Sequence, residues 1–374
     1  MSETHLIQEK IMLDENFDKY YLAISALAEV SPVLKTALLE YFDLNPVSFI
    51  NSNEDDLNLF ASNYPEIKIP RNFLVKLKEL DVDKIYDEVV SSGFKYITIQ
   101  DENYPHLLKE IQDYPCVLFY KGKYSPEIFE NTLAIVGSRR ASENAKSSLK
   151  RIMSGMQNAP ITIVSGLAYG IDAEAHRLAL ELNLRTIGVI GSGLSHTYPS
   201  SNLDLYRQIP ENNLIISEYL PSVPPVNYHF PQRNRIITGL SLGTLVAEAA
   251  LKSGAMISAN LALEQGRELM CIPGLITNPN TEGIYKLLKS GAGLVTSAED
   301  VYEYLGFDFS STKKEVELSE DEEKIVSALQ LEEQSFENLV EKTKINPTSL
   351  LVHLTGLELK GLIKQTRGKY FITD

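Results

Sequence analysis

The chain has 374 residues, of which 44% are hydrophobic, so it can build two or three domains with cores of their own. Its net charge of −15 argues against broad, non-specific binding to nucleic acid. No apolar stretch approaches the ~20 residues of a membrane helix, and the polar start MSETHLIQEK lacks the apolar core of a signal peptide, so we expect a cytoplasmic protein without membrane contact.

Helical patterns joined by short loops dominate residues 1–93. Ser31 and Asn45 are each followed by proline, a combination of N-cap residue and first-turn proline that begins helices. Gly93 follows the last helical pattern and is expected to end it. We therefore predict a small acidic helical domain, SAM-like in class, over residues 1–93.

Short apolar runs alternate with helical patterns over residues 94–309. Runs that are apolar throughout are typical of strands buried on both faces, and their alternation with helices indicates a mostly parallel sheet covered on both sides. We predict a doubly wound, Rossmann-like α/β domain. Its strands are expected at FKYITIQ, PCVLFYKG, LAIVG, ITIVS, TIGVIG, LIISEY, GTLVAEAA, ELMCIPG and GLVTS, and its helices include 142–156, 172–182, 258–265 and 283–289.

Residues 310–317 form a polar linker, and a third pattern follows over residues 318–374. It consists of three helices, at 319–330, 335–342 and 347–359, and then two short strands. This order predicts a winged-helix-like module. Because the helix expected to act as the recognition helix is poor in cations, a protein contact or a purely structural role is at least as well supported as DNA binding.

Glycine-rich turns follow several of the predicted strands. They are GSRR (137–140), SGLAYGID (165–172), GSG (191–193) and SGA (253–255). Ligands of doubly wound folds bind outside the carboxyl ends of the strands, so these turns point to one crevice. Backbone N–H groups of Gly137, Ser138 and Arg139 can converge there on a phosphate, and Gly166 allows close backbone approach.

Cations gather at these turns although the chain is acidic elsewhere. Residues 1–90 carry 8 Lys and Arg against 17 Asp and Glu, whereas residues 91–310 carry 18 against 21. Arg233 and Arg235 lie near the start of a helix that contains Pro231, where the helix dipole disfavours a cation unless an anion is bound. We predict a phosphate site; the alternative is that these arginines pair with carboxylates such as Glu218 or Glu248.

An enzyme is a second interpretation of the same turns. Asp172 and His176 share one helix face and could act as an orienting carboxylate and a base, with Glu248 as a carboxylate catalyst. The competing interpretation, which we favour, is that Asp172 caps its helix and His176 is a partly buried side chain. No dinucleotide, nucleoside-triphosphate or metal motif appears, so no cofactor or metal is expected, and Cys116 and Cys271 are expected to be buried and reduced.

Taken in order, GSR, SGLAYGIDAEAHRLAL, GSGLSHTYP, FPQRNRIITGLS, VAEAALKSGAMISA and EQGRELMCIPG resemble the DprA/Smf family of DNA-processing proteins, over about residues 94–305. The resemblance implies a non-enzymatic, homodimeric protein that binds and protects single-stranded DNA and loads the RecA recombinase during natural transformation. It also implies DNA contacts by Phe230, a stacking surface, and by Asn234. The complete candidate site is Gly137, Ser138, Arg139, Ser165, Gly166, Phe230, Arg233, Asn234, Arg235 and Lys252.

Two other classes share parts of this pattern. A nucleotide-cleaving phosphoribohydrolase on a similar Rossmann core carries a PGGxGTxxE signature, which SLGTLVAEA echoes only in part. The glycine pair is missing, and the spacing from Thr244 to Glu248 is one residue longer. A scaffold that contacts proteins through its acidic ends would leave the cluster of arginines without a role. We therefore rank the nucleic-acid-binding protein first.

Overall fold

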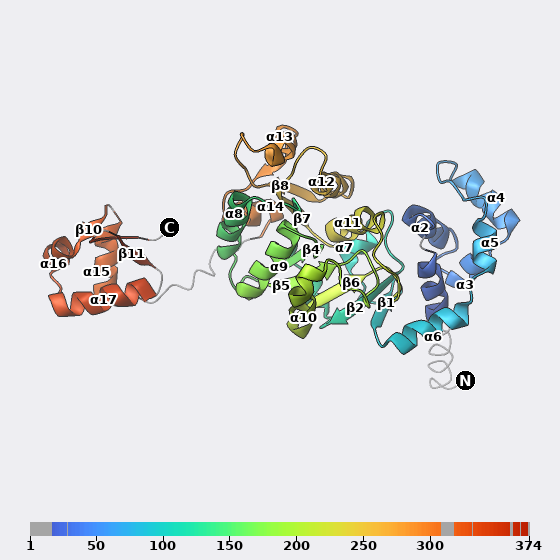
Figure 1. Cartoon of the computed structure of the whole chain (residues 1–374), viewed down its shortest axis with the longest axis horizontal. Helices are drawn as coiled ribbons and strands as arrows, with labels where there is room; N and C mark the ends of the chain where they lie inside the picture. The colour runs from blue at the N-terminus through green and yellow to red at the C-terminus, as the bar shows by residue number, and fades with distance from the viewer. Residues whose placement is uncertain are drawn as a thin grey trace. The chain divides into compact units, whose positions relative to one another are not determined.

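The computed structural model describes residues 17–27, 29–307, 318–330, 332–359, 362–366 and 368–372 (Figure 1). The chain divides into two compact units, Met1–Phe309 and Ser310–Asp374. A further boundary within the first unit, at residue 93, stays a prediction, and the proposed linker lies outside the described residues.

The amino-terminal part of the first unit is helical, as predicted. Ser31 Oγ accepts a hydrogen bond from Leu34 N, and Asn45 Oδ1 accepts from Val47 N, so both predicted caps are present. Gly93 ends the last of these helices in the left-handed conformation, at φ 71°. Besides a helix at 17–26, the helices are α2 (Pro32–Tyr41), α3 (Pro46–Ile50), α4 (Glu54–Asn63), α5 (Phe73–Lys78) and α6 (Val82–Ser92).

A sheet of nine strands forms the centre of the described part of this unit. Its order is β1-β2-β6-β5-β4-β3-β7-β8-β9. β2 pairs antiparallel with both β1 and β6, and every other neighbouring pair, including β5 with β6, is parallel. The predicted doubly wound, mostly parallel fold is therefore confirmed. The strands are β1 (Lys95–Thr98), β2 (Val117–Gly122), β3 (Thr132–Gly137), β4 (Thr162–Ser165), β5 (Arg185–Val189), β6 (Leu214–Ser217), β7 (Gly243–Glu248), β8 (Glu268–Cys271) and β9 (Gly293–Leu294).

Helices cover both faces of the sheet because apolar side chains of the central strands point to both faces. In β3, Leu133 and Ile135 belong to one buried cluster, whereas Ala134 and Val136 belong to another. Each fully buried leucine or isoleucine contributes about 1.5–3 kcal/mol of transfer free energy. The helices are α7 (His106–Lys109), α8 (Glu143–Ser154), α9 (Ile171–Glu181), α10 (Leu203–Asn212), α11 (His229–Gly239), α12 (Gly254–Glu264), α13 (Glu282–Lys289) and α14 (Ala298–Leu305).

One boundary differs from the prediction in a way that matters for the site. The helix expected from Ser258 begins one turn earlier, at Gly254, because Ser253 takes the extended conformation of an N-cap residue. Ser253 and Gly254 therefore form a helix amino end and not an isolated turn.

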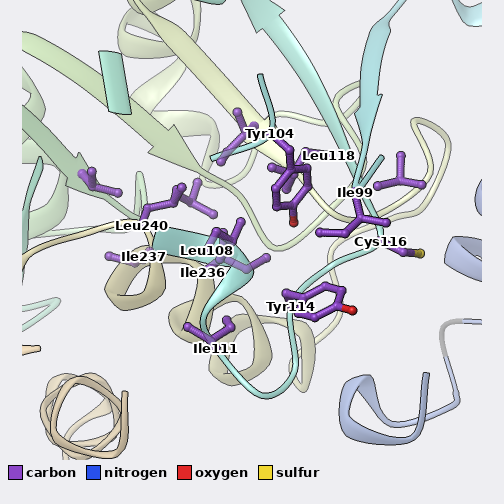
Figure 2. Close-up of a cluster of buried hydrophobic side chains, with 14 of the residues drawn as sticks. Ile99, Tyr104, Leu108, Ile111, Tyr114, Cys116, Leu118, Ile236, Ile237 and Leu240 are labelled. Atoms are coloured by element: carbon purple, nitrogen blue, oxygen red, sulfur yellow. The ribbon is translucent and has the colours of Figure 1, made fainter. Parts of the chain in front are cut away.

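A buried apolar cluster joins α11 to the segment that precedes β2 (Figure 2). Ile236 and Ile237 of α11 and Leu240, which follows this helix, pack with Leu108 and Ile111. The cluster continues through Tyr114 and Cys116. A methyl group on Gly239 would lie 3.0 Å from both Leu108 and Ile111, so this helix packs closely. Cys116 and Cys271 are free and buried, as predicted.

The second unit has the predicted winged-helix class. Its helices are α15 (Glu320–Leu329), α16 (Phe336–Thr343) and α17 (Pro347–Leu359), and its small sheet has the order β10-β12-β11. The strands are β10 (Gln334–Ser335), β11 (Ile363–Thr366) and β12 (Lys369–Ile372). β10 was not predicted, because two residues are too short for a periodic signal.

Within the described residues, no helix is both long and apolar enough to span a bilayer. The same residues contain no cluster of three or more His, Cys, Asp or Glu side chains that could hold a metal ion.

Candidate functional site

A cleft of about 630 Å³ opens where the strand order changes direction, between β3 and β7. Loops after β3, β4 and β7 form its walls together with α11 and the start of α12. The predicted convergence of the glycine-rich turns is confirmed for GSRR, SGLAYGID and SGA, and the GSG turn lines a smaller hollow beside the cleft. The lining residues that matter below are Gly137, Ser138, Arg139, Arg140, Asp172, Arg233, Asn234, Lys252, Ser253 and Gly254.

Exposed cations stand at the cleft. Arg139 and Arg140 follow β3, Lys252 follows β7, and their side chains form no ion pair with the described residues. Asp172, whose carboxylate is buried, is the acidic side chain among the lining residues. The cleft therefore carries a local positive charge on an acidic protein.

The amino end of α12 also favours an anion at the cleft. Its first turn contains no acidic residue, and Ser253 makes no side-chain cap, so the N–H groups of Gly254 and Ala255 are left for another acceptor. Lys252 immediately precedes this helix end. Free amide groups, the positive end of the helix dipole and a lysine together suit a phosphate.

Gly170 brings two walls of the cleft together. It adopts φ 75°, and a Cβ there would lie 2.2 Å from the carbonyl oxygen of Ser138. The next residue, Ile171, donates its N–H to that same oxygen over 3.2 Å. The loop after β4 can contact the loop after β3 only with glycine at this position.

Arg233 lines the cleft, but its guanidinium group donates hydrogen bonds to the protein backbone. Its side chain is 3% exposed, and Nη1 donates to the carbonyl oxygens of Gly166, at 2.5 Å, and Val189. Burial lowers the pKa of Arg233, and the nearby Asp172 opposes that shift. Gly166 is needed for this contact, because a Cβ there would lie 2.6 Å from the guanidinium carbon. Arg233 thus fixes the loops after β4 and β5 at the cleft.

Arg235, which we predicted as a site residue, does not line the cleft. Its guanidinium is 3% exposed and pairs with Glu218, Nη2 to Oε2 2.6 Å, and with Asp113, Nε to Oδ2 3.2 Å. Burial acts to lower the pKa of Arg235, but Glu218 and Asp113 raise it overall. The alternative interpretation, pairing with Glu218, holds for this arginine.

Ser165, also a predicted site residue, does not line the cleft either. It is fully buried at the end of β4, and its hydroxyl donates to the carbonyl oxygen of Ile135 over 2.7 Å. The hydroxyl therefore joins two neighbouring strands and does not line the cleft.

Aromatic rings extend the cleft toward the GSG turn. The guanidinium of Arg139 lies over the ring of Phe230, 5.7 Å from its centroid, and Phe230 stacks on Tyr198 at 5.2 Å. Tyr169 lines the same hollow, and both tyrosines are exposed. Sequence analysis missed Tyr169 and Tyr198; the signal that could have found them is an aromatic residue inside a glycine-rich turn.

The residues of the enzyme interpretation have structural partners. Asp172 does not cap α9, whose N-cap is Gly170; its Oδ2 accepts from Gly166 N over 3.2 Å. His176 is fully buried with Nδ1 2.7 Å from Thr186 Oγ1, and burial lowers its pKa to about 3. Glu248 accepts from Ser142 N and Oγ and from Asn278 Nδ2.

The fold and the site define the class of protein: a doubly wound α/β domain with a cationic, aromatic-edged cleft at its switch point, followed along the chain by a winged helix. The family model described as DNA recombination-mediator protein A matches residues 95–306, and that of the DprA winged helix domain matches residues 310–369. The chain belongs to this DprA family, which confirms the resemblance drawn from its motifs.

Relatives share both sequence and fold. The chain is 44% identical over 247 residues to DNA processing protein DprA of Streptococcus pneumoniae, covering 66% of this chain and 87% of the relative. For the Bacillus subtilis protein the identity is 40%, covering 57% and 72%. The X-ray structure of the S. pneumoniae protein gives a TM-score of 0.65 at 37% identity, covering 77% of this chain and 97% of that one.

A second solved relative, DNA processing protein A from Helicobacter pylori, gives a TM-score of 0.51 at 29% identity, covering 57% of this chain and 97% of that one. Its structure is described as showing a single-stranded DNA binding mode.

Proposed function

We propose that this protein binds single-stranded DNA in the cleft between β3 and β7. The observation that carries the proposal is the set of unpaired cations, Arg139, Arg140 and Lys252, around the free amino end of α12. The H. pylori relative, described as binding single-stranded DNA, supports the choice of ligand. Backbone recognition of this kind gives affinity with little sequence preference.

The adjoining rings favour a single strand over a duplex. Phe230, Tyr198 and Tyr169 line the hollow next to the cations, so bases of a strand whose phosphates occupy the cleft can stack there. Bases in a duplex are already stacked on each other and cannot reach these rings. Asn234, Gly137 and Ser138 complete the proposed contact surface, and Arg233 supports it from within.

A titration of labelled oligonucleotides tests this function. Single-stranded DNA should bind at least tenfold more tightly than duplex of the same sequence, and its affinity should fall as salt rises. Equal or stronger binding of the duplex would contradict the proposal.

We further propose that the protein is a homodimer that protects incoming single strands in the cytoplasm and transfers them to the RecA recombinase. Leu275, Ile276 and Leu294 are large exposed apolar side chains on or after the last two strands of the sheet, and they suit a self-complementary contact. Light scattering should report the mass of two chains. The mass of one chain would contradict the dimer. RecA should form filaments faster on single strands to which this protein is already bound. If this protein only slows filament formation, the proposed transfer to RecA is contradicted.

We propose no turnover of nucleotides, against the alternative of a phosphoribohydrolase-like enzyme. Glu248 is 1% exposed and accepts hydrogen bonds from the side chains of Ser142 and Asn278. His176 does not line the cleft. Incubation with nucleoside monophosphates and triphosphates followed by chromatography should release neither base nor phosphate. Release that disappears in Glu248→Gln would support the enzyme instead.

A further inference from the structure

A cluster of buried and partly buried charged side chains lies beneath α11. Arg235 of α11 pairs with Asp113, from the segment before β2, and with Glu218, which follows β6. Lys35 of α2 lines a small cavity together with Glu218 and Arg235. Two cations and two anions, each from a different part of the chain, balance one another in a place where an unpaired charge is costly.

The small cavity lies between this cluster and α2. Oε1 of Glu218 and Nη1 of Arg235 are buried without a hydrogen-bond partner among the described residues. The cavity holds about 10 Å³, the space of one water, so a water can bridge these atoms to Lys35. Burial lowers the pKa of Lys35 and the charge of Arg235 adds to that shift, whereas the carboxylate of Glu218 opposes it.

The helix α2 is fixed at this position by a second contact. Thr36, the neighbour of Lys35, donates its hydroxyl to the carbonyl oxygen of Tyr114 over 3.0 Å. Tyr114 belongs to the apolar cluster that packs against Ile236 and Ile237 of α11 (Figure 2). The amino-terminal helices therefore reach α11 through both charge and packing.

α11 stands between this cluster and the cleft. Arg235 faces Glu218, whereas Arg233 and Asn234 line the cleft on the same helix. The backbone oxygen of Arg235 also accepts a hydrogen bond from the side chain of Gln265, just after α12. A shift of α11 would therefore also act on α12, whose amino end lines the cleft.

From this arrangement we infer that Lys35 is a positioning residue for the cleft: it completes the charge cluster that holds α11, and so couples the amino-terminal helices to DNA binding. The inference rests on the proposed function. Coupling is reciprocal, so any ligand of the amino-terminal helices that displaces α2 lowers DNA affinity, and bound DNA holds α2 in place.

The test compares Lys35→Met with Lys84→Met, a change of an exposed lysine in α6, and with Lys35→Arg. Lys35→Met should weaken single-stranded DNA binding about threefold to tenfold, in the range that residues on such contact chains contribute. Lys84→Met should bind like the unmodified protein, and Lys35→Arg should recover most of the loss. In a double-mutant cycle, Lys35→Met and Glu218→Gln should be less than additive, because both disrupt one cluster.

Affinity of folded Lys35→Met within twofold of the unmodified protein overturns the inference, and so does an equal loss in Lys84→Met. If Lys35→Met does not fold, amide exchange of the unmodified protein decides: saturating single-stranded DNA should slow exchange in α2, and unchanged exchange there overturns the coupling. Failure of the unmodified protein to bind any single strand would instead contradict the proposed function itself.

Discussion

Arg235 and Glu218 form an ion pair beneath α11, with Nη2 2.6 Å from Oε2 and exposures of 3% and 8%. Removing the arginine would leave the buried carboxylate of Glu218 and the partly buried carboxylate of Asp113 without their partner. Arg235→Ala should therefore lower the free energy of unfolding by about 3–5 kcal/mol. Urea unfolding measures this, with Arg151→Ala on the exposed side of α8 as control. A loss below about 1 kcal/mol would show that the pair is not desolvated.

The close contact at Gly170 predicts a steric effect. Gly170→Ala would place Cβ 2.2 Å from the Ser138 oxygen, forcing apart the loops after β3 and β4. Gly266 is a matched control, since it has φ 67° but no atom within 4 Å of its Cβ. Gly266→Ala should cost only the backbone strain of about 1 kcal/mol, whereas Gly170→Ala should cost more and also weaken DNA binding. Equal effects of the two changes on melting and on DNA affinity would refute this role.

The stack of Tyr198 on Phe230 predicts a contribution from base stacking. Tyr198→Ala should weaken single-stranded DNA binding by about 1–3 kcal/mol, and Tyr198→Phe should retain it, because the ring and not the hydroxyl contacts a base. Fluorescence anisotropy on both variants measures the difference. If Tyr198→Phe loses as much affinity as Tyr198→Ala, the hydroxyl is the contact and stacking is the wrong explanation.

The winged helix is predicted to be dispensable for DNA affinity. It forms a unit of its own, and the exposed face of α17 carries Leu351 and Val352, at 54% and 66% exposure, where a DNA-reading helix needs cations. A chain ending at Ser310 should bind single strands within about twofold of the full chain. A loss of tenfold or more would show that this unit reads DNA.

Sequence patterns predicted the sheet because buried parallel strands leave a strong local signal. In β3, β4 and β7 each run is apolar on both faces and is followed by a small residue or a turn. Capping residues such as Ser31 and Asn45 act on their own neighbours, so they too could be predicted.

The orientation of the arginines could not be obtained in this way. Residues two apart on a helix are separated by about 200° around its axis, so helix geometry indicates that Arg233 and Arg235 point in different directions but not which of them faces the cleft. Which of the two faces the cleft depends on Glu218 and Asp113, whose positions are set by distant strands. Tyr198 likewise becomes part of the site only when its turn packs beside Phe230.

The most direct test of the account is the salt dependence of single-stranded DNA binding by Arg139→Ala/Lys252→Ala, compared with the unmodified protein and with Arg151→Ala. Three cations at the cleft predict a slope of log K against log salt of about −2 for the unmodified protein, from ~0.7 per phosphate. Both changed side chains are exposed, so melting should be unaffected. The double variant should lose affinity and flatten the slope by about 1.4, and Arg151→Ala should do neither. An unchanged slope and affinity in the double variant would contradict the claim that DNA binds in this cleft.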